Sequence, residues 1–337
     1  MRVLLVFVDG VGLGDADAAR NAFAAAPPRT MTALLDGTTP MRRVAPVRAR
    51  NATLVALDAT LGVAGTPMSG TGQTALLTGH NAPAEYGRHF GPWVPSTLRH
   101  LLRTQSLLAR ARTAGFTVAF ANAYPEEVVR HAHDMNGDDE PDSERRGTGV
   151  VSRATHDAVP SDAGGGRNRR ATRFLSAGPP LVALGAGVLD RHTRELERGD
   201  AIASEITNDG WREKLGRRSV PAITARRAGQ NLARIASHHD VTLFAHYTTD
   251  YAGHSKRLDH AVAAIQTVDE FIAGIVGAID DETLVVVASD HGNIEDITTD
   301  HTLNPAIGLV IGSRHAEVAG EWTSVLDVTP GLLAVLG

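Results

Sequence analysis

Short, fully apolar runs that alternate with amphipathic stretches constrain the fold of this 337-residue chain more than any other feature. Residues 2–8 (RVLLVFV) form a continuous apolar run that ends at Asp9-Gly10. Such a run is typical of a central parallel strand that is buried on both faces of a sheet. Similar runs predict further strands at residues 116–121, 241–245, 284–288 and 307–311.

Helical stretches lie between several of these runs. Residues 260–279 give the clearest signal, because apolar residues recur there at every third or fourth position and would form one buried helix face. Residues 98–114 and 223–237 precede the second and third apolar runs. Strands that alternate with helices in this way predict an α/β fold, a doubly wound and mostly parallel sheet with helices on both faces.

The alternation weakens in the middle of the chain. Residues 136–173 are rich in Gly, Asp, Ser and Arg and lack a hydrophobic period, which predicts a long loop or lid. We therefore expect residues 1–124 and 222–337 to form the core. Residues 125–221 would form a small inserted cap over the ligand edge of the sheet.

The amino-acid composition limits the kinds of site and partner that this chain can have. The chain contains no Cys, which excludes disulfides, thiolate zinc sites and Cys nucleophiles. A formal net charge of −5 gives no electrostatic reason to expect a nucleic-acid or membrane partner. No apolar stretch approaches the roughly 20 residues that a membrane helix needs. The apolar run at residues 3–8 is too short for a secretory signal, so we expect a cytoplasmic protein.

Acidic and His residues follow three of the predicted strands. Ligands of open parallel sheets gather at the carboxyl ends of the strands, so this placement predicts a metal site on one edge. A carboxylate beside an imidazole, as in the SDHGN motif, suits manganese or zinc. An isolated Asp-His pair is more often a hydrogen-bonded turn, but here other candidate ligands accompany it. The residues are Asp9, Asp250, His254, Asp290 and His291.

A second set of ligands is predicted from helical spacing. Asp250 and His254 are four positions apart, so on a helical turn their side chains would share a face and could bind one ion. His301 lies ten residues after His291 and would complete a set of two imidazoles and one carboxylate. Such a set leaves open positions for a substrate.

The segment at residues 65–80 (GTPMSGTGQTALLTGH) supplies hydroxyl groups. Its Gly-rich backbone could approach an anion, and the helix start that follows would favour negative charge. A hydroxyl becomes a usable nucleophile there only if a metal lowers its pKa. The segment lacks the Gly-Lys-Ser/Thr ending of a P-loop, and residues 10–14 lack the spacing of a dinucleotide motif. The candidate hydroxyls belong to Ser69, Thr71 and Thr74.

Four ordered motifs resemble a known family. SDHGNIED followed by HTLNPA resembles the C-terminal signature of cofactor-independent phosphoglycerate mutases. TTDYAGH resembles their D-x-x-GH segment with one extra residue, VDGVGLG resembles their opening, and LDVTPGLLAVLG resembles the closing strand and helix of the superfamily. Over residues 1–80 and 240–337, the chain thus resembles the alkaline phosphatase superfamily, on the branch of cofactor-independent phosphoglycerate mutase and phosphopentomutase.

The resemblance implies two divalent metal ions per chain, with manganese favoured and zinc also suited to the donors. One ion would be held by Asp250, His254 and His301. The other would be held by Asp9, Asp290, His291 and the nucleophile. In the superfamily the nucleophile lies nine residues before a small-residue–Gly pair, and counting back from Thr78-Gly79 gives Ser69 as the catalytic residue. Thr71 and Thr74 would then be structural or would contact phosphate.

The implied reaction passes through a phosphoserine, from which water or a second substrate hydroxyl takes the phosphoryl group. The middle of the chain lacks the inserted domains of both mutases, and a mutase needs a close-fitting cap to retain its intermediate. We therefore expect a phosphatase that acts on a small phosphorylated metabolite, with a phosphomutase as the alternative. A phosphodiesterase or phosphonate hydrolase would share the metal chemistry. A non-catalytic descendant is disfavoured because all six predicted carboxylate and His ligands are present, and a sulfatase because its motif is absent.

Four side chains of the expected cap could reach a substrate phosphate across the cleft. His131 and His133 alternate, so on a strand they would face the same side. A solvated loop explains the Arg cluster equally well. The four candidates are His131, His133, Arg167 and Arg170.

Overall fold

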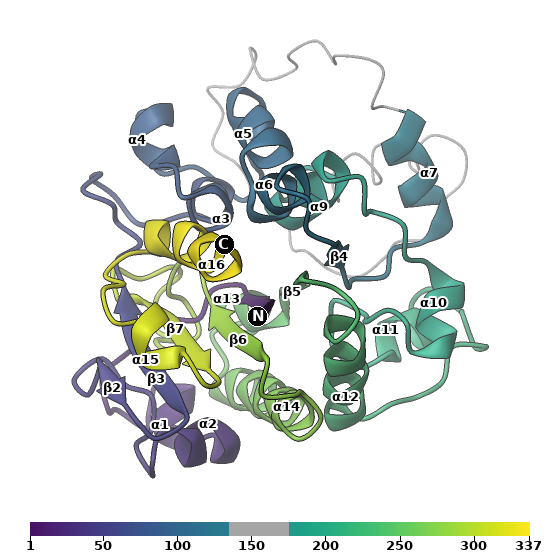
Figure 1. Ribbon diagram of the computed structural model, residues 1–337. Helices are drawn as coiled ribbons and strands as arrows, with labels where there is room; N and C mark the ends of the chain where they lie inside the picture. Colours follow the sequence, from purple (N-terminus) through teal and green to yellow (C-terminus); the bar gives the residue numbers. More distant parts are fainter. Residues whose placement is uncertain (135–174) are drawn as a thin grey trace.

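The computed structural model describes residues 1–134 and 175–337, without the side chains of residues 133 and 134. A seven-stranded sheet forms its centre, in the order β2-β3-β7-β6-β1-β5-β4 (Figure 1). The strands are β1 (Arg2–Val8), β2 (Val47–Arg48), β3 (Ala52–Leu57), β4 (Val118–Phe120), β5 (Val241–His246), β6 (Thr283–Ala288) and β7 (Ala306–Ile311).

Four neighbouring strands, β6, β1, β5 and β4, run parallel to one another. On the other side of β6, β7 runs antiparallel to it, and β3 runs antiparallel to β7. The strands β2 and β3 were not predicted. Because β7 is reversed, it begins at the edge where β6 ends. The loop before β7 therefore reaches the same edge as the residues that follow β1, β5 and β6.

Helices cover both faces of the sheet, which confirms the predicted α/β class (Figure 1). In β1, Val3, Leu5 and Phe7 join one hydrophobic cluster, and the residues between them join the other. The first cluster includes residues of α3 (Ser69–Thr78), α5 (Arg99–Thr104), α6 (Leu107–Thr113), α9 (Gly178–Gly185) and α16 (Val328–Leu336). The second includes residues of α1 (Ala22–Ala25), α2 (Arg29–Leu34), α12 (Ala225–Ala236) and α14 (Leu258–Val276).

Shorter elements complete the described part of the chain. They are α4 (Ala82–Tyr86), α7 (Glu126–Asp134), α10 (Thr193–Arg198), α11 (Asp209–Glu213), α13 (Thr248–His254), α15 (His315–Val318) and the 3₁₀ turns η1 (Ser96–Leu98) and η4 (Val325–Asp327). The predicted helix at residues 98–114 is divided into η1, α5 and α6, whereas α12 and α14 match their predictions closely. The proposed domain boundaries at residues 125 and 221 stay a prediction.

The expectation that His131 and His133 share one side of a strand is wrong. Both residues lie in helix α7. Residues two positions apart on a helix are rotated by about 200° about its axis, so the alternation argument for a strand does not apply here. Arg167 and Arg170 lie outside the described residues, as does the side chain of His133.

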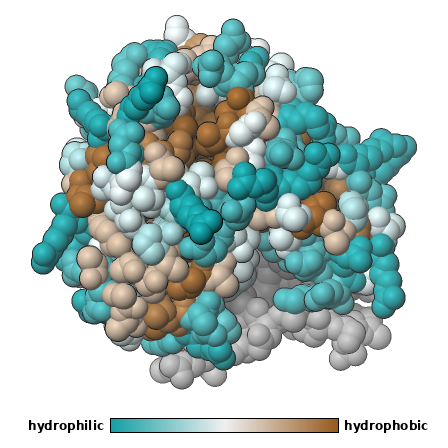
Figure 2. Space-filling model, turned by 90° about the horizontal axis from the view of Figure 1, so that it is seen from below, coloured by the Kyte–Doolittle hydropathy of each residue, from teal (hydrophilic) through white to brown (hydrophobic). Residues whose placement is uncertain are grey.

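The surface seen in Figure 2 alternates hydrophilic residues with several separate hydrophobic patches. Among the residues that the structure describes, no helix is both long and apolar enough to cross a membrane. The predicted cytoplasmic location stays a prediction.

Helices α12 and α14 pack closely because each carries a glycine that lies against the backbone of the other helix. A Cβ atom at Gly229 would overlap the carbonyl oxygen of Phe271, and one at Gly274 would overlap the carbonyl oxygen of Arg226. The two helices therefore approach more closely than larger residues would allow. Their apolar residues belong to the second hydrophobic cluster.

We predict that Gly274→Ala lowers the free energy of unfolding by about 1–3 kcal/mol, because the added methyl group forces the two helices apart. Gly277→Ala is the control, since its Cβ would meet nothing nearer than the Ala273 carbonyl oxygen at 3.2 Å. Denaturant unfolding measures both variants. Equal stability of the two would show that the close approach is unimportant.

Candidate metal centre

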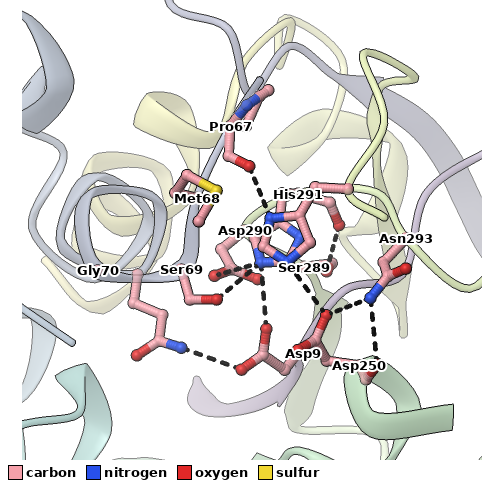
Figure 3. Close-up of polar contacts among 12 residues, drawn as sticks. Asp9, Pro67, Met68, Ser69, Gly70, Asp250, Ser289, Asp290, His291 and Asn293 are labelled. Carbon is pink, nitrogen blue, oxygen red and sulfur yellow. Dashed lines mark hydrogen bonds and ion pairs between the residues drawn. The ribbon is translucent and has the colours of Figure 1, made fainter. Parts of the chain in front are cut away.

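The predicted ligands gather at the edge of the sheet where β1, β5 and β6 end (Figure 3). These six residues come from four connections: one residue follows β1, one pair lies on α13 after β5, one pair follows β6, and one residue lies on the loop before the reversed β7. In this order they are Asp9, Asp250 and His254, Asp290 and His291, and His301.

One group of possible ligands consists of Asp250, His254 and His301, whose ligand atoms all lie within 4.8 Å of one another. Helix α13 places Asp250 and His254 one turn apart, as predicted, with His254 Nε2 3.2 Å from Asp250 Oδ2. His301 Nε2 lies 3.5 Å from the other oxygen, Asp250 Oδ1.

A second group consists of Asp9, Asp250 and His291. His291 Nε2 lies 3.4 Å from Asp9 Oδ1 and 3.6 Å from Asp290 Oδ2. Asp290 was predicted to be a ligand of this group, and it lies beside the group, fully buried. Asp250 belongs to both groups, which the sequence did not indicate. Asp250 therefore connects the two halves of the centre.

The hydrogen bonds of the imidazoles direct their Nε2 atoms into the centre. His301 Nδ1 lies 2.9 Å from the Pro67 carbonyl oxygen, and His291 Nδ1 lies 3.3 Å from that of Gly292. A carbonyl oxygen only accepts, so each Nδ1 carries a proton, and in the neutral imidazole each Nε2 can bind an ion. His301 Nε2 also faces His254 Nε2 at 3.2 Å. Such converging nitrogens and carboxylates suit a divalent transition metal.

Burial sets the charges of this centre. Burial, together with the charge of Asp250, raises the pKa of Asp9; burial, together with Asp9, raises that of Asp290 well above its usual value. Burial opposes the charged form of His291, but Asp290 and Asp9 outweigh it and raise the His291 pKa to about 10. Burial and repulsion from His291 lower the pKa of His301 to about 4.

Several acceptors of this centre have no hydrogen-bond partner in the described part of the chain. They are Asp9 Oδ1, both carboxylate oxygens of Asp290, and Asn293 Oδ1, all buried. A buried acceptor without a partner is costly, and cations bound in the centre would satisfy the Asp9 and Asp290 oxygens. The residues present therefore fit a metal centre.

Ser69 is the hydroxyl that reaches this centre. It is the first residue of α3, is buried, and places Oγ 3.0 Å from His291 Nε2 (Figure 3). The other two candidate hydroxyls bond to backbone instead. Thr71 Oγ1 contacts the carbonyl oxygens of Met68 and Phe90, and Thr74 Oγ1 donates to the Gly70 carbonyl oxygen at 2.8 Å.

Sequence reasoning missed two amides that support the ligands. Gln73 Nε2 donates to Asp9 Oδ2 at 3.1 Å, and Gln73 Oε1 accepts from the Gly178 amide at 2.9 Å. Asn293 Nδ2 donates to Asp250 Oδ1 at 2.6 Å. The available signals were local: Gln73 lies one helical turn after Ser69, and Asn293 ends the SDHGN motif.

Comparisons with known proteins find similarity to metalloenzymes. Residues 218–336 match the family model of the Metalloenzyme superfamily. A 2,3-bisphosphoglycerate-independent phosphoglycerate mutase of Desulforudis audaxviator is 31% identical over 125 residues, which are 35% of this chain and 25% of that protein. One from Thiobacillus denitrificans is 34% identical over 116 residues, 32% of this chain and 22% of that protein. The chain thus spans about a quarter of the length of these relatives.

Among solved structures, the PH0037 protein from Pyrococcus horikoshii superposes with a TM-score of 0.54 at 11% identity. The superposition covers 99% of this chain and 96% of that one, so the two share their fold. Over residues 218–336, about the C-terminal third, the chain is thus similar to the Metalloenzyme superfamily, and part of it is similar to 2,3-bisphosphoglycerate-independent phosphoglycerate mutases.

Proposed function

We propose that this protein is a two-metal phosphoryl-transfer enzyme that works through a phosphoserine at Ser69. The observation that carries the proposal is the position of the Ser69 hydroxyl, which contacts His291 Nε2 inside the cluster of predicted ligands. A nucleophile in this superfamily needs such a place, because an ordinary serine hydroxyl is too weak an acid to react unaided.

Two ligand sets would hold the ions. The first is Asp250, His254 and His301, and the second is Asp9, Asp290, His291 and Ser69, with Asp250 close enough to serve both. Mixed oxygen and nitrogen donors favour manganese and also suit zinc. Bound divalent ions would lower the pKa of the Ser69 hydroxyl and neutralise the charge of the phosphoryl group.

The chain itself orients the reaction. Ser69 stands at the N-terminus of α3, where the helix dipole favours the negative charge of a serine oxygen and of a phosphate. The Ser69 hydroxyl gives up its proton, and its Oγ forms the new P–O bond while the bond to the substrate oxygen breaks; the released oxygen takes up one proton, so the step has no net change in protons. In the second step an acceptor oxygen attacks the phosphoserine, and Ser69 leaves.

The acceptor decides between two activities. The relatives named phosphoglycerate mutase support intramolecular transfer, in which a second hydroxyl of the same small metabolite accepts the phosphoryl group. We therefore favour a phosphomutase over the phosphatase that the sequence alone had favoured. Hydrolysis is the second candidate, because His254 is 41% exposed at the mouth of the centre, where water could reach the reacting groups.

Ser69→Ala should lower phosphoryl transfer by a factor of about 10³ or more, because no other hydroxyl in the segment reaches the ligands. Thr78→Val is the control. Thr78 lies on the same buried helix, and its hydroxyl bonds only to backbone, so this variant should keep its activity. An active Ser69→Ala protein would move the nucleophile to Thr71 or Thr74.

The acceptor can be identified by following phosphorus with ³¹P NMR in the presence of Mn²⁺ or Zn²⁺, with phosphorylated sugars and sugar acids as substrates. A mutase converts one phosphate isomer into another without releasing phosphate, and we expect this result. Release of inorganic phosphate would identify a phosphatase. If the metal-loaded protein showed neither reaction, nor hydrolysis of phosphodiesters or phosphonates, the proposed function would be wrong.

Metal binding at neutral pH should release at least one proton. The pKa of His291 is raised to about 10 without metal, so its imidazole is charged at neutral pH, whereas a metal-bound imidazole must be neutral. Titration calorimetry with Mn²⁺ in two neutral buffers of different ionisation enthalpy measures the proton count. Binding without proton release would exclude His291 as a ligand.

A further inference from the structure

Glu295 lies at the end of the SDHGNIE sequence and is 1% exposed, yet it belongs to neither group of candidate ligands. Its carboxylate accepts four hydrogen bonds. Oε2 accepts from the amides of Gly12 at 3.0 Å and Asn293 at 2.8 Å. Oε1 accepts from the hydroxyl of Thr302 and from Asn304 Nδ2, the latter at 3.1 Å. All four donors belong to this chain, so both oxygens of the buried carboxylate have hydrogen-bond partners within the protein.

The donors lie on the connections that carry the predicted ligands. Gly12 is three residues after Asp9, Asn293 is two residues after His291, and Thr302 is next to His301. Asn293 extends the network to the remaining connection, because its side-chain amide donates to Asp250 Oδ1 at 2.6 Å and to the Asp250 carbonyl oxygen at 3.1 Å. All four ligand-bearing connections are thus one or two hydrogen bonds from a single carboxylate.

Three glycines make room for this side chain. A Cβ atom at Gly12 would lie 2.5 Å from the Glu295 carboxyl carbon, and one at Gly14 would lie 2.9 Å from Glu295 Cγ. A Cβ at Gly292 would overlap Glu295 Oε1. The glycines of the VDGVGLG segment therefore allow the loop after β1 to close around Glu295.

We propose that Glu295 is a positioning residue that fixes the separation of the metal ligands by tying their loops to one carboxylate. The proposal rests on the metal centre of the proposed function. A carboxylate is required because both of its oxygens accept, whereas an amide accepts through only one. Glu295→Gln keeps the shape of the side chain but must turn its amino group toward either the Gly12 and Asn293 amides or the Thr302 and Asn304 donors.

The test compares Glu295→Gln with Asp269→Asn. Asp269 is also 1% exposed and accepts from two backbone amides, those of Thr30 and Met31, both at 2.9 Å, but it supports helix α2 rather than a ligand loop. Both substitutions leave buried amides without their acceptor, so both should lower the melting temperature of the metal-free protein. Only Glu295→Gln should change metal binding.

Titration with Mn²⁺, followed by calorimetry and by electron paramagnetic resonance, provides the readout. We expect Glu295→Gln to bind Mn²⁺ about 10- to 100-fold more weakly and to change the spectrum of the saturated protein, while Asp269→Asn matches wild type in both. Equal Mn²⁺ affinity of Glu295→Gln and wild type, or equal weakening in the two variants, would overturn the proposal. If wild type itself bound no metal, the proposed function would fall and this inference with it.

Thr302→Val provides a second variant should Glu295→Gln fail to fold. It removes one donor to Glu295 and leaves the carboxylate and every candidate ligand in place. Weaker Mn²⁺ binding than wild type is expected, by a smaller factor than for Glu295→Gln. Unchanged affinity and spectrum in this variant would contradict the role of the network in setting the loop that carries His301.

Discussion

The concentration of buried negative charge at one sheet edge is the constraint on which the rest of this structure depends. Asp9, Asp250 and Asp290 are each less than 10% exposed and converge on the same imidazole, His291. Burial raises the pKa values of Asp9 and Asp290, and the like charge of the neighbouring carboxylates adds to this effect. Protonated His291 compensates part of this charge in the metal-free protein, and a divalent ion would compensate more of it. The site is therefore built for cations before any substrate is considered.

The sheet topology explains how residues so far apart in sequence reach one point. Parallel β1, β5 and β6 deliver Asp9, Asp250 and the Asp290-His291 pair at their carboxyl ends. His301 arrives from the opposite direction, because β7 is antiparallel to β6 and begins at the same edge. The short isolated bridge between Gly292 and Thr302 then joins the loop after β6 to the loop before β7. One reversed strand thus brings the third imidazole to a centre that parallel strands alone would leave incomplete.

Local patterns in the sequence predicted much of this arrangement, and nonlocal relations account for what they missed. The apolar run of β1 and the i, i+4 spacing of Asp250 and His254 depend on neighbouring residues, and both predictions agree with the structure. The presence of β3 depends on pairing with β7, some 250 residues away in sequence, and the reversal of β7 depends on its pairing with β6; periodicity records neither relation. His131 was assigned to a strand because alternation over two residues cannot be distinguished from part of a helix. Glu295 was not predicted because its role depends on the hydrogen-bond donors around it, which the residue type does not reveal.

The supporting shell shows why the same residues serve stability and function. Gln73 satisfies a buried donor and also contacts the candidate ligand Asp9, whereas Glu295 satisfies buried donors on the loops that carry candidate ligands. Gln73 also ties Asp9 to the amide of Gly178 at the start of α9, which connects the metal centre to the hydrophobic cluster on one face of the sheet. An ion that binds only the folded state stabilises it in proportion to the logarithm of its free concentration. On the proposed function, divalent ions bound by the three carboxylates would therefore also stabilise the fold.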